Sequence, residues 1–317
     1  MKNIIDQIRE NIPWRPFEIK DTERIPKGDM PGDKIEIGPK HIEKAQVIFP
    51  HLLEELIPVM EQNPSQRAVV VVCGGSGVGK SETASLLAHY LNQIGVGSYT
   101  LSGDNYPHRL PQYNDAERLR IFRKSGIDGL IANGQYNQGR YTILKEIQES
   151  GQDSNPEYAT RYPWLSLYQH AGRCGLKNYL GTEREINFTE LSSIVSQFKN
   201  GASGIFLKRM GRDECSLWYD SVDFSEKQVL IIEWTHGNND NLQGVDIPIL
   251  LNSTPAETLE HRKSRNRDGG TDSTFITTVL ELEQGLLISQ AHKAKLIVSK
   301  NGELLSYGDF RKLMAEV

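Results

Sequence analysis

The stretch AVVVVCGGSGVGKS, residues 68–81, decides the fold of this chain. Its first six residues form a continuous apolar and mostly β-branched run, which is typical of a strand buried on both faces. SETASLLAHYLNQIG, residues 81–95, follows with the apolar spacing of an amphipathic helix and a glycine at its end. A buried strand, a glycine-rich turn and a helix in direct succession predict the beginning of an α/β fold.

The glycine-rich turn matches the pattern G-x-x-x-x-G-K-[ST], which cradles phosphate groups. Its glycines let successive backbone N–H groups point at an anion, and the start of the following helix adds a partial positive charge. We expect Lys80 to reach the β- and γ-phosphates of ATP and the Ser81 hydroxyl to ligate Mg2+. The candidate ATP-binding residues are Gly74, Gly75, Ser76, Gly77, Val78, Gly79, Lys80, Ser81 and Glu82.

Four further strands are predicted: GSYTLSGD (97–104), which ends in a turn, QVLIIEW (228–234), DIPILLNS (246–253) and KAKLIVS (293–299). Because helical patterns alternate with them, we expect a doubly wound parallel sheet of the P-loop NTPase type, with helices on both faces. Further helices are predicted from Pro39 to Met60, with Pro50 interrupting the middle, and from Gly308. Another begins at Thr254, where Glu257 completes a capping box.

The chain divides into a flanking segment, residues 1–66, and a P-loop domain, residues 67–317. The first ~35 residues are rich in Pro, Gly and charge, and are expected to be irregular. About 120 residues separate the second and third core strands, too many for a plain crossover. We therefore expect an inserted lid or substrate subdomain at approximately 126–226, whose aromatic residues are Tyr136, Tyr141, Tyr158, Tyr162, Trp164, Tyr168 and Tyr179.

Two acidic residues fall at the carboxyl ends of predicted strands, where open α/β sheets bind their ligands. Glu233 ends an apolar strand, where a carboxylate without a cation would be costly, so we expect it to hold Mg2+ or its waters. Asp104 ends the second strand and could orient an acceptor hydroxyl and take its proton. A salt bridge for Glu233 and a turn or helix-cap role for Asp104 are the structural alternatives.

Two arginine-rich segments are candidate phosphate or substrate contacts. In HRKSRNRDGG (261–270), Arg262, Arg265 and Arg267 suit a lid that neutralises charge on a transferring phosphate, or else a solvated basic face. The second segment follows Asp104 and contains His108, Arg109, Arg118, Arg120 and Arg123. Because guanidinium groups bind anions in a bidentate manner, it predicts an anionic acceptor bound by His108, Arg109 and Arg120; a surface helix is the structural alternative.

Composition fits an ordinary globular protein of 317 residues, with a net charge of −5 that gives no sign of nucleic-acid binding. Three widely spaced cysteines, Cys73, Cys174 and Cys215, show no disulfide or metal spacing, and Cys73 is expected to be a buried structural thiol. No apolar run approaches the ~20 residues that span a bilayer, and the first residues do not resemble a secretion signal. A cytoplasmic location is expected.

These residues resemble the uridine kinase and phosphoribulokinase family of P-loop kinases. The resemblance covers roughly residues 67–300, without the middle third, and rests on GGSGVGKS (74–81), GDNYPHR (103–109), WYD (218–220), LIIEWTHGN (230–238) and HRKSRNRD (261–268). It implies that ATP donates its γ-phosphate to a metabolite hydroxyl. Asp104 would act on that hydroxyl, Glu233 would belong to the Mg2+ site, Tyr106 and Tyr219 would contact the substrate, and the arginines with Asp268 would form the lid.

Two departures from the family pattern leave the acceptor open: Trp234 follows Glu233 where the family has glycine, and no proline precedes the Tyr-Asp pair. The segment SGDN with His108, followed by AERLRIFR (116–123), also resembles adenylylsulfate kinases. A regulatory P-loop ATPase that phosphorylates no metabolite is the alternative of another class, and Asp104 argues against it. The expected partner is an anionic small molecule rather than nucleic acid or membrane, and homo-oligomerisation is left open.

Overall fold

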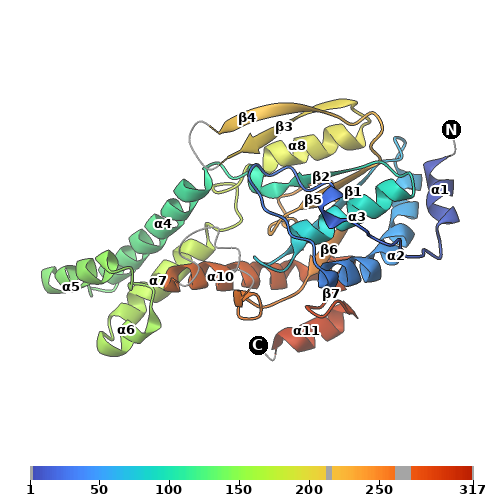
Figure 1. The fold of residues 1–317 in the computed structure, drawn as a ribbon. Coiled ribbons are helices and arrows are strands. Elements are labelled where there is room, and N and C mark those ends of the chain that lie inside the picture. The colour runs from blue at the N-terminus through green and yellow to red at the C-terminus, as the bar shows by residue number, and fades with distance from the viewer. Residues whose placement is uncertain (1–2, 212–215, 261–272, 316–317) are drawn as a thin grey trace. The chain divides into compact units, whose positions relative to one another are not determined.

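The computed structural model describes residues 3–211, 216–260 and 273–315 (Figure 1). The chain folds into two compact units, whose bounds differ from those of the predicted segments. The first unit comprises Met1–Tyr106, Asn187–Thr254 and Leu287–Val317, and the second comprises Pro107–Ile186 and Pro255–Leu286. The flanking segment 1–66 is thus part of the unit that carries the phosphate-binding loop.

The first unit is built on a six-stranded sheet in the order β2-β5-β1-β6-β7-β8. All neighbours pair in parallel except β7 and β8, which are antiparallel. The strands are β1 (Ala68–Gly74), β2 (Ser98–Ser102), β5 (Val229–Glu233), β6 (Ile247–Leu251), β7 (Leu296–Val298) and β8 (Leu304–Leu305). The predicted α/β sheet is confirmed, and the five predicted strands are β1, β2, β5, β6 and β7.

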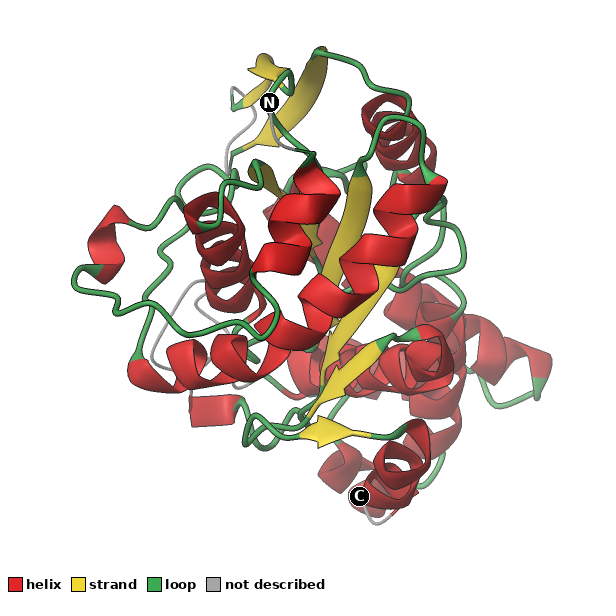
Figure 2. Cartoon of the chain, turned by 90° about the vertical axis from the view of Figure 1, so that its right-hand side faces the viewer, coloured by secondary structure: helices red, strands yellow, loops and turns green. Residues whose placement is uncertain are grey.

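Two helices, α2 (Pro39–Gln62) and α3 (Lys80–Gln93), pack against each other and against one face of this sheet (Figure 2). The predicted interruption at Pro50 is wrong, because α2 continues through both Pro50 and Pro58. Its buried face includes Phe49, Leu52 and Leu56, so tertiary packing offsets the backbone hydrogen bonds that proline cannot make. The first residues also contain more regular structure than expected: α1 (Ile4–Glu10) and the 3-10 helix η1 (Thr22–Arg24).

The helix α8 (Phe188–Lys199) contacts β1 and leads into the antiparallel hairpin of β3 (Gly204–Met210) and β4 (Leu217–Asp223). Arg67, just before β1, ties these elements to the sheet. Its guanidinium donates to the carbonyl oxygens of Phe198 at 2.9 Å, Ala202 at 2.7 Å and Phe224 at 2.7 Å. One buried cation thereby satisfies three carbonyl groups at the end of α8 and around the hairpin.

The described part of the second unit is helical. Its elements are α4 (Pro111–Ala132), α5 (Gln138–Glu149), α6 (Pro156–Arg161), α7 (Leu165–Lys177) and most of α10 (Thr274–Gln290). Aromatic and aliphatic side chains, among them Phe122 and Tyr168, form its core. A Cβ atom on Gly126 would lie 2.5 Å from the Tyr168 ring, so the close approach of α4 and α7 requires glycine there.

The predicted helix start at Thr254 is wrong: Pro255–Thr258 forms a turn, closed by a bond from the Thr258 hydroxyl to the Pro255 carbonyl, and helical structure begins at Leu259. No helix among the described residues is long and apolar enough to cross a membrane. Cys73 is fully buried, and burial raises its thiol pKa to about 12, which fits a structural thiol.

Candidate active site

The predicted phosphate cradle is the loop between β1 and α3. Val78 anchors it in the hydrophobic core, while Gly79, with φ 92°, adopts the left-handed conformation that favours glycine. Gly74 is also constrained, because a Cβ atom there would lie 2.5 Å from the Leu251 carbonyl oxygen. Lys80 begins α3 and turns back over the loop, where its ammonium donates to the Gly75 carbonyl at 3.1 Å. The amine is therefore held beside the cradle.

Glu233 joins the two strand ends that carry predicted site residues. The Ser81 hydroxyl donates to its Oε2 at 3.0 Å, and the Ser102 hydroxyl donates to its Oε1. Burial and the charge of nearby Asp104 raise the pKa of the Glu233 carboxyl, while Lys80 acts in the opposite direction. A cation at this position would lower the cost of keeping the carboxylate charged, so the residues present fit a divalent metal.

Among the described residues, no group of three or more His, Cys, Asp or Glu side chains could enclose a metal ion by itself. Mg2+ in nucleotide sites is usually bound by one or two protein groups, with substrate phosphates and water completing its octahedron. The Ser81 and Glu233 pair matches that requirement.

Asp104 lies in the 3-10 turn Gly103–Asn105 that follows β2, with its side chain exposed. Its charge contributes to the raised pKa of Glu233, so the two carboxylates are electrostatic neighbours. Because β2 and β5 are parallel and adjacent, their carboxyl ends bring the two acids to one edge of the sheet. The predicted acceptor-side and metal-side acids thus come together.

Trp234, the departure from the family pattern, packs beneath this turn. Its side chain is buried, and a Cβ atom on Gly103 would lie 2.1 Å from the indole Cγ. The indole therefore fills the space that a side chain at position 103 would need. Glycine precedes Asp104 because the backbone must approach Trp234 closely.

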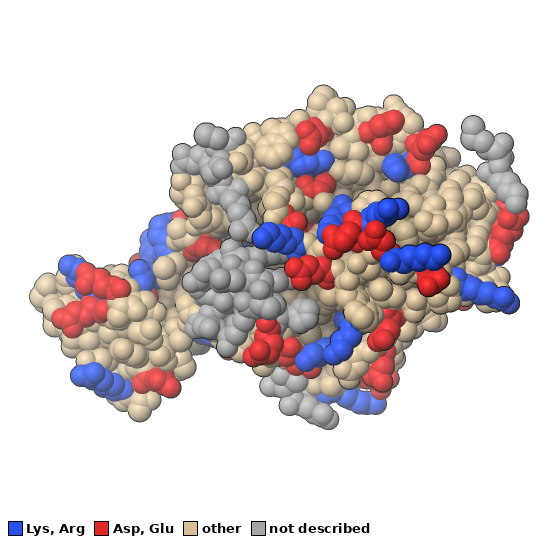
Figure 3. Space-filling view, viewed as in Figure 1, with Lys and Arg blue, Asp and Glu red and all other residues tan. Residues whose placement is uncertain are grey.

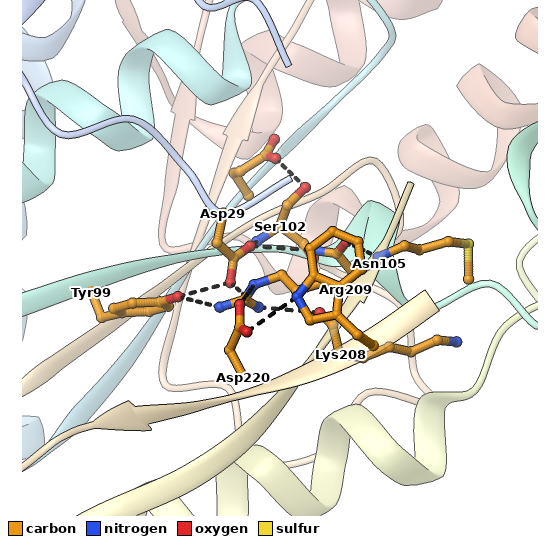
Figure 4. Close-up of polar contacts among 10 residues, drawn as sticks. Asp29, Tyr99, Ser102, Asn105, Lys208, Arg209 and Asp220 are labelled. Atoms are coloured by element: carbon orange, nitrogen blue, oxygen red, sulfur yellow. Dashed lines mark hydrogen bonds and ion pairs between the residues drawn. The ribbon is translucent and has the colours of Figure 1, made fainter. Parts of the chain in front are cut away.

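Two residues of the flanking segment also reach the site, and sequence reasoning missed both. The ring of His41, on α2, lies 3.1 Å from the position of a Cβ on Gly79. Its Nδ1 accepts the Gly38 N–H at 3.1 Å, which places the proton of a neutral ring on Nε2. The other residue, Asp29, binds the turn that carries Asp104 (Figure 4).

Two predicted substrate contacts lie elsewhere. Tyr106 has no exposed surface, and burial strongly raises the pKa of its hydroxyl, so it is a core residue and the prediction that it contacts substrate is wrong. Tyr219 is 51% exposed on β4, and its hydroxyl donates to Glu190 Oε1 at 2.8 Å. Tyr219 remains accessible to a ligand, whereas Tyr106 does not.

The predicted anion-binding residues belong to the second unit. The guanidinium of Arg120 donates twice to Glu117, at 2.7 and 2.8 Å, with 60% of the arginine side chain exposed. Arg109 donates to the Tyr179 hydroxyl at 3.1 Å and lies 3.8 Å from the same Glu117 carboxylate. His108 contacts the Glu183 carbonyl at 2.8 Å. Both arginines are thus already near a carboxylate.

The neighbouring arginines of α4 are paired as well. Arg118 contacts Glu185 at 2.6 Å and Glu283 at 3.3 Å, and Arg123 contacts Asp153. Charges of both signs also lie side by side over the face of the molecule shown in Figure 3. The predicted lid residues Arg262, Arg265, Arg267 and Asp268 lie outside the described residues.

No family model matches the chain. The bifunctional alpha-galactosidase/sucrose kinase AgaSK of Mediterraneibacter gnavus is 36% identical over 253 residues, which cover 80% of this chain and 22% of that protein. The chain is a homologue of part of this kinase-containing protein. It spans about a fifth of that relative's length.

A shorter match is to the adenylyl-sulfate kinase of Escherichia coli O1:K1, 40% identical over 70 residues, or 21% of this chain and 35% of that enzyme. The D-glycerate 3-kinase structure from Cryptococcus neoformans superposes with a TM-score of 0.45 and 12% identity, covering 85% of this chain and 98% of that one. The predicted relationship to P-loop kinases is confirmed by the curated sequences.

Proposed function

We propose that this chain is an ATP-dependent kinase that phosphorylates a hydroxyl of a neutral carbohydrate, with sucrose as the first candidate. The observation that carries the proposal is the arrangement at the edge of the sheet. A phosphate cradle, a buried acid bound to the cradle serine and a second, exposed acid converge there. The partial match to AgaSK supports the carbohydrate assignment.

ATP would bind with its phosphates on the loop 74–79 and Lys80 beside them. Ser81 and Glu233, joined at 3.0 Å, would hold Mg2+, whose role is to neutralise charge on the phosphate oxygens. The pKa of Glu233 lies above its ordinary value without a ligand, so metal binding would favour loss of its proton. His41 would face the same loop from α2.

Asp104 would act on the acceptor. In the transfer step, an acceptor hydroxyl oxygen forms a bond to the γ-phosphorus while the bond from that phosphorus to the β–γ bridging oxygen breaks, releasing ADP. The hydroxyl proton passes to the Asp104 carboxylate. An exposed acid next to a buried one suits this role, because it can accept a proton and return it to solvent.

The charge pairing of Arg109 and Arg120 favours a neutral acceptor over the predicted anionic one. Arg109 and Arg120 share the carboxylate of Glu117, so binding an anion would require breaking or competing with these pairs. A carbohydrate needs no such change, since its hydroxyl groups can donate to the paired carboxylate.

The test is ADP release by the purified protein with Mg-ATP and a panel of sucrose, other sugars, glycerate, uridine and adenylylsulfate. Mass spectrometry would identify the phosphorylated product. We expect a neutral sugar to stimulate ADP release, and Asp104→Asn to lower kcat while ATP binding is kept. ADP release that no acceptor stimulates would favour a regulatory ATPase and overturn the proposal.

Adenylylsulfate phosphorylation is the second candidate, because 70 residues match an adenylyl-sulfate kinase at 40% identity. The match is confined to 21% of the chain, whereas the AgaSK match covers 80%. Preference for adenylylsulfate over every sugar in the same panel would establish this alternative. Raised acceptor KM in Arg109→Ala and Arg120→Ala would accompany it.

A further inference from the structure

The carboxylate of Asp29 lies at the centre of a buried polar cluster in the first unit (Figure 4). Its Oδ1 accepts the backbone N–H of Ser102 at 2.7 Å and the side-chain amide of Asn105 at 3.2 Å. Its Oδ2 accepts the hydroxyl of Tyr99 at 3.0 Å and the guanidinium of Arg209 at 2.9 Å. Only 9% of the Asp29 side chain is exposed.

Four donors fill the hydrogen-bonding capacity of this carboxylate. A group with no acceptor site left over is poorly suited to bind a ligand directly. The donors instead fall into two sets: Ser102, the last residue of β2, and Asn105 flank Gly103-Asp104 in the chain, whereas Tyr99 lies earlier in β2 and Arg209 lies on β3. Asp29 therefore connects the turn that carries Asp104 to two strands.

A second contact fixes the same turn. The Asn105 side-chain oxygen accepts the backbone N–H of Met210, the last residue of β3, at 2.9 Å. The Ser102 hydroxyl also donates to Glu233. Ser102 and Asn105, which precede and follow Gly103-Asp104, are thus each bound by Asp29 and by one further residue. Asp29 itself belongs to the segment 1–66.

The segment that delivers Asp29 is itself anchored. Ile25 and Ile35 are buried on either side of it. Between them, Met30-Pro31-Gly32-Asp33 forms a turn in which the Asp33 N–H donates to the Met30 carbonyl at 3.3 Å, with Gly32 at φ 72°. Asp29 immediately precedes this turn, so its backbone is constrained from both directions.

We propose that Asp29 is a positioning residue that holds Asp104 in place for phosphoryl transfer, an inference that rests on the proposed role of Asp104 toward the acceptor hydroxyl. It assigns a function to the flanking segment 1–66: this segment completes the acceptor side of the active site. Catalytic groups must be held to within a fraction of an ångström, and misplacement by ~1 Å can lower a rate ~100-fold.

Asp29→Asn is the sharpest test, because it keeps the shape and changes one acceptor into a donor. The remaining oxygen should turn toward the charged Arg209, since charge-assisted hydrogen bonds are the stronger ones. The new amide nitrogen then faces two donors, the Ser102 N–H and the Asn105 amide. We expect a ~100-fold lower kcat, an ATP KM within twofold of wild type, and faster hydrogen exchange at the Ser102 amide.

Two further variants separate positioning from general stability. Asn105→Ala removes a bond on the turn side of Asp29, whereas Tyr99→Phe removes a bond to the same carboxylate on the strand side. We expect Asn105→Ala to lower kcat at least tenfold and Tyr99→Phe less than threefold. This pair decides the question even if Asp29→Asn does not fold.

Equal losses of kcat in Asn105→Ala and Tyr99→Phe would overturn the proposal, as would Asp29→Asn with wild-type kcat and wild-type protection of Ser102. Failure of the proposed function looks different. In that case the wild-type protein phosphorylates no acceptor of the panel, while hydrogen exchange still reports whether Asp29 restrains the turn.

Discussion

Replacing Gly103 by alanine would place a methyl group where the indole of Trp234 lies. The new Cβ would be 2.1 Å from the indole Cγ, whereas carbon atoms in contact are ~3.5–4.0 Å apart, so something must move by ~1.5 Å. The buried indole contacts the rings of Phe188 and His236, whose centroids are each 5.4 Å away. We therefore expect the turn to move and to carry Asp104 with it.

A displacement of this size should lower kcat ~100-fold, and overpacking should reduce the free energy of unfolding by ~1–3 kcal/mol. ATP affinity should stay within twofold, because the phosphate-binding loop is on a different strand. The measurements are steady-state kinetics with the best acceptor, ATP titration, and chemical denaturation. Gly204→Ala is the matched control, because a Cβ there meets nothing within 4 Å.

The double variant Gly103→Ala, Trp234→Gly tests the steric cause. Removing the indole makes room for the methyl group, so adding Gly103→Ala to Trp234→Gly should cost less than tenfold in kcat. A full ~100-fold loss in that background would refute the reasoning, since it would show that the effect of Gly103→Ala does not pass through Trp234.

Three other changes probe different parts of the chain. Lys80→Ala should remove ~3–4 kcal/mol of transition-state stabilisation and so lower kcat, measured as ADP release. Full activity in a folded variant would contradict a role of Lys80 in phosphoryl transfer. Burial and a neighbouring carboxylate raise the pKa of Glu233 above its unfolded-state value, so the ligand-free protein should lose stability as pH rises from about 4.5 to about 8. Glu233→Gln should make the Tm of thermal unfolding fall less over this pH range. Parallel plots of Tm against pH for the wild type and the variant would argue against Glu233 as the cause. Glu185→Ala should destabilise the second unit by ~1–3 kcal/mol, because it removes the closest carboxylate of Arg118, whose side chain is only 15% exposed; unchanged hydrogen exchange across α4 would count against this.

The parts of the site that depend on local pattern could be predicted from the sequence. The phosphate-binding loop follows β1, Glu233 ends β5 and Asp104 follows β2, and strand ends in a parallel sheet meet at one edge. The five core strands were predictable for the same reason. The apolar runs of β1 and β5 are continuous because these two strands are buried on both faces.

Contacts between distant segments could not be predicted in this way. Arg118 looks like a free cation in sequence, but its carboxylate partner Glu185 lies 67 residues away. Asp29 stands among prolines, glycines and charges, and only its four partners reveal its importance. Tyr106 follows an acid at a strand end and resembles a substrate contact, yet its ring points into the core.

The hydrogen bonds of Asp29 also constrain the order in which the chain can fold. Ser102 and Asn105 lie 73 and 76 residues after it, and Arg209 lies 180 residues after it. At a synthesis rate of ~5–20 residues per second, Asp29 exists for roughly 10–40 s before Arg209 is made. The segment around Asp29 is therefore made well before Arg209, and it cannot complete its contacts until Arg209 has been synthesised.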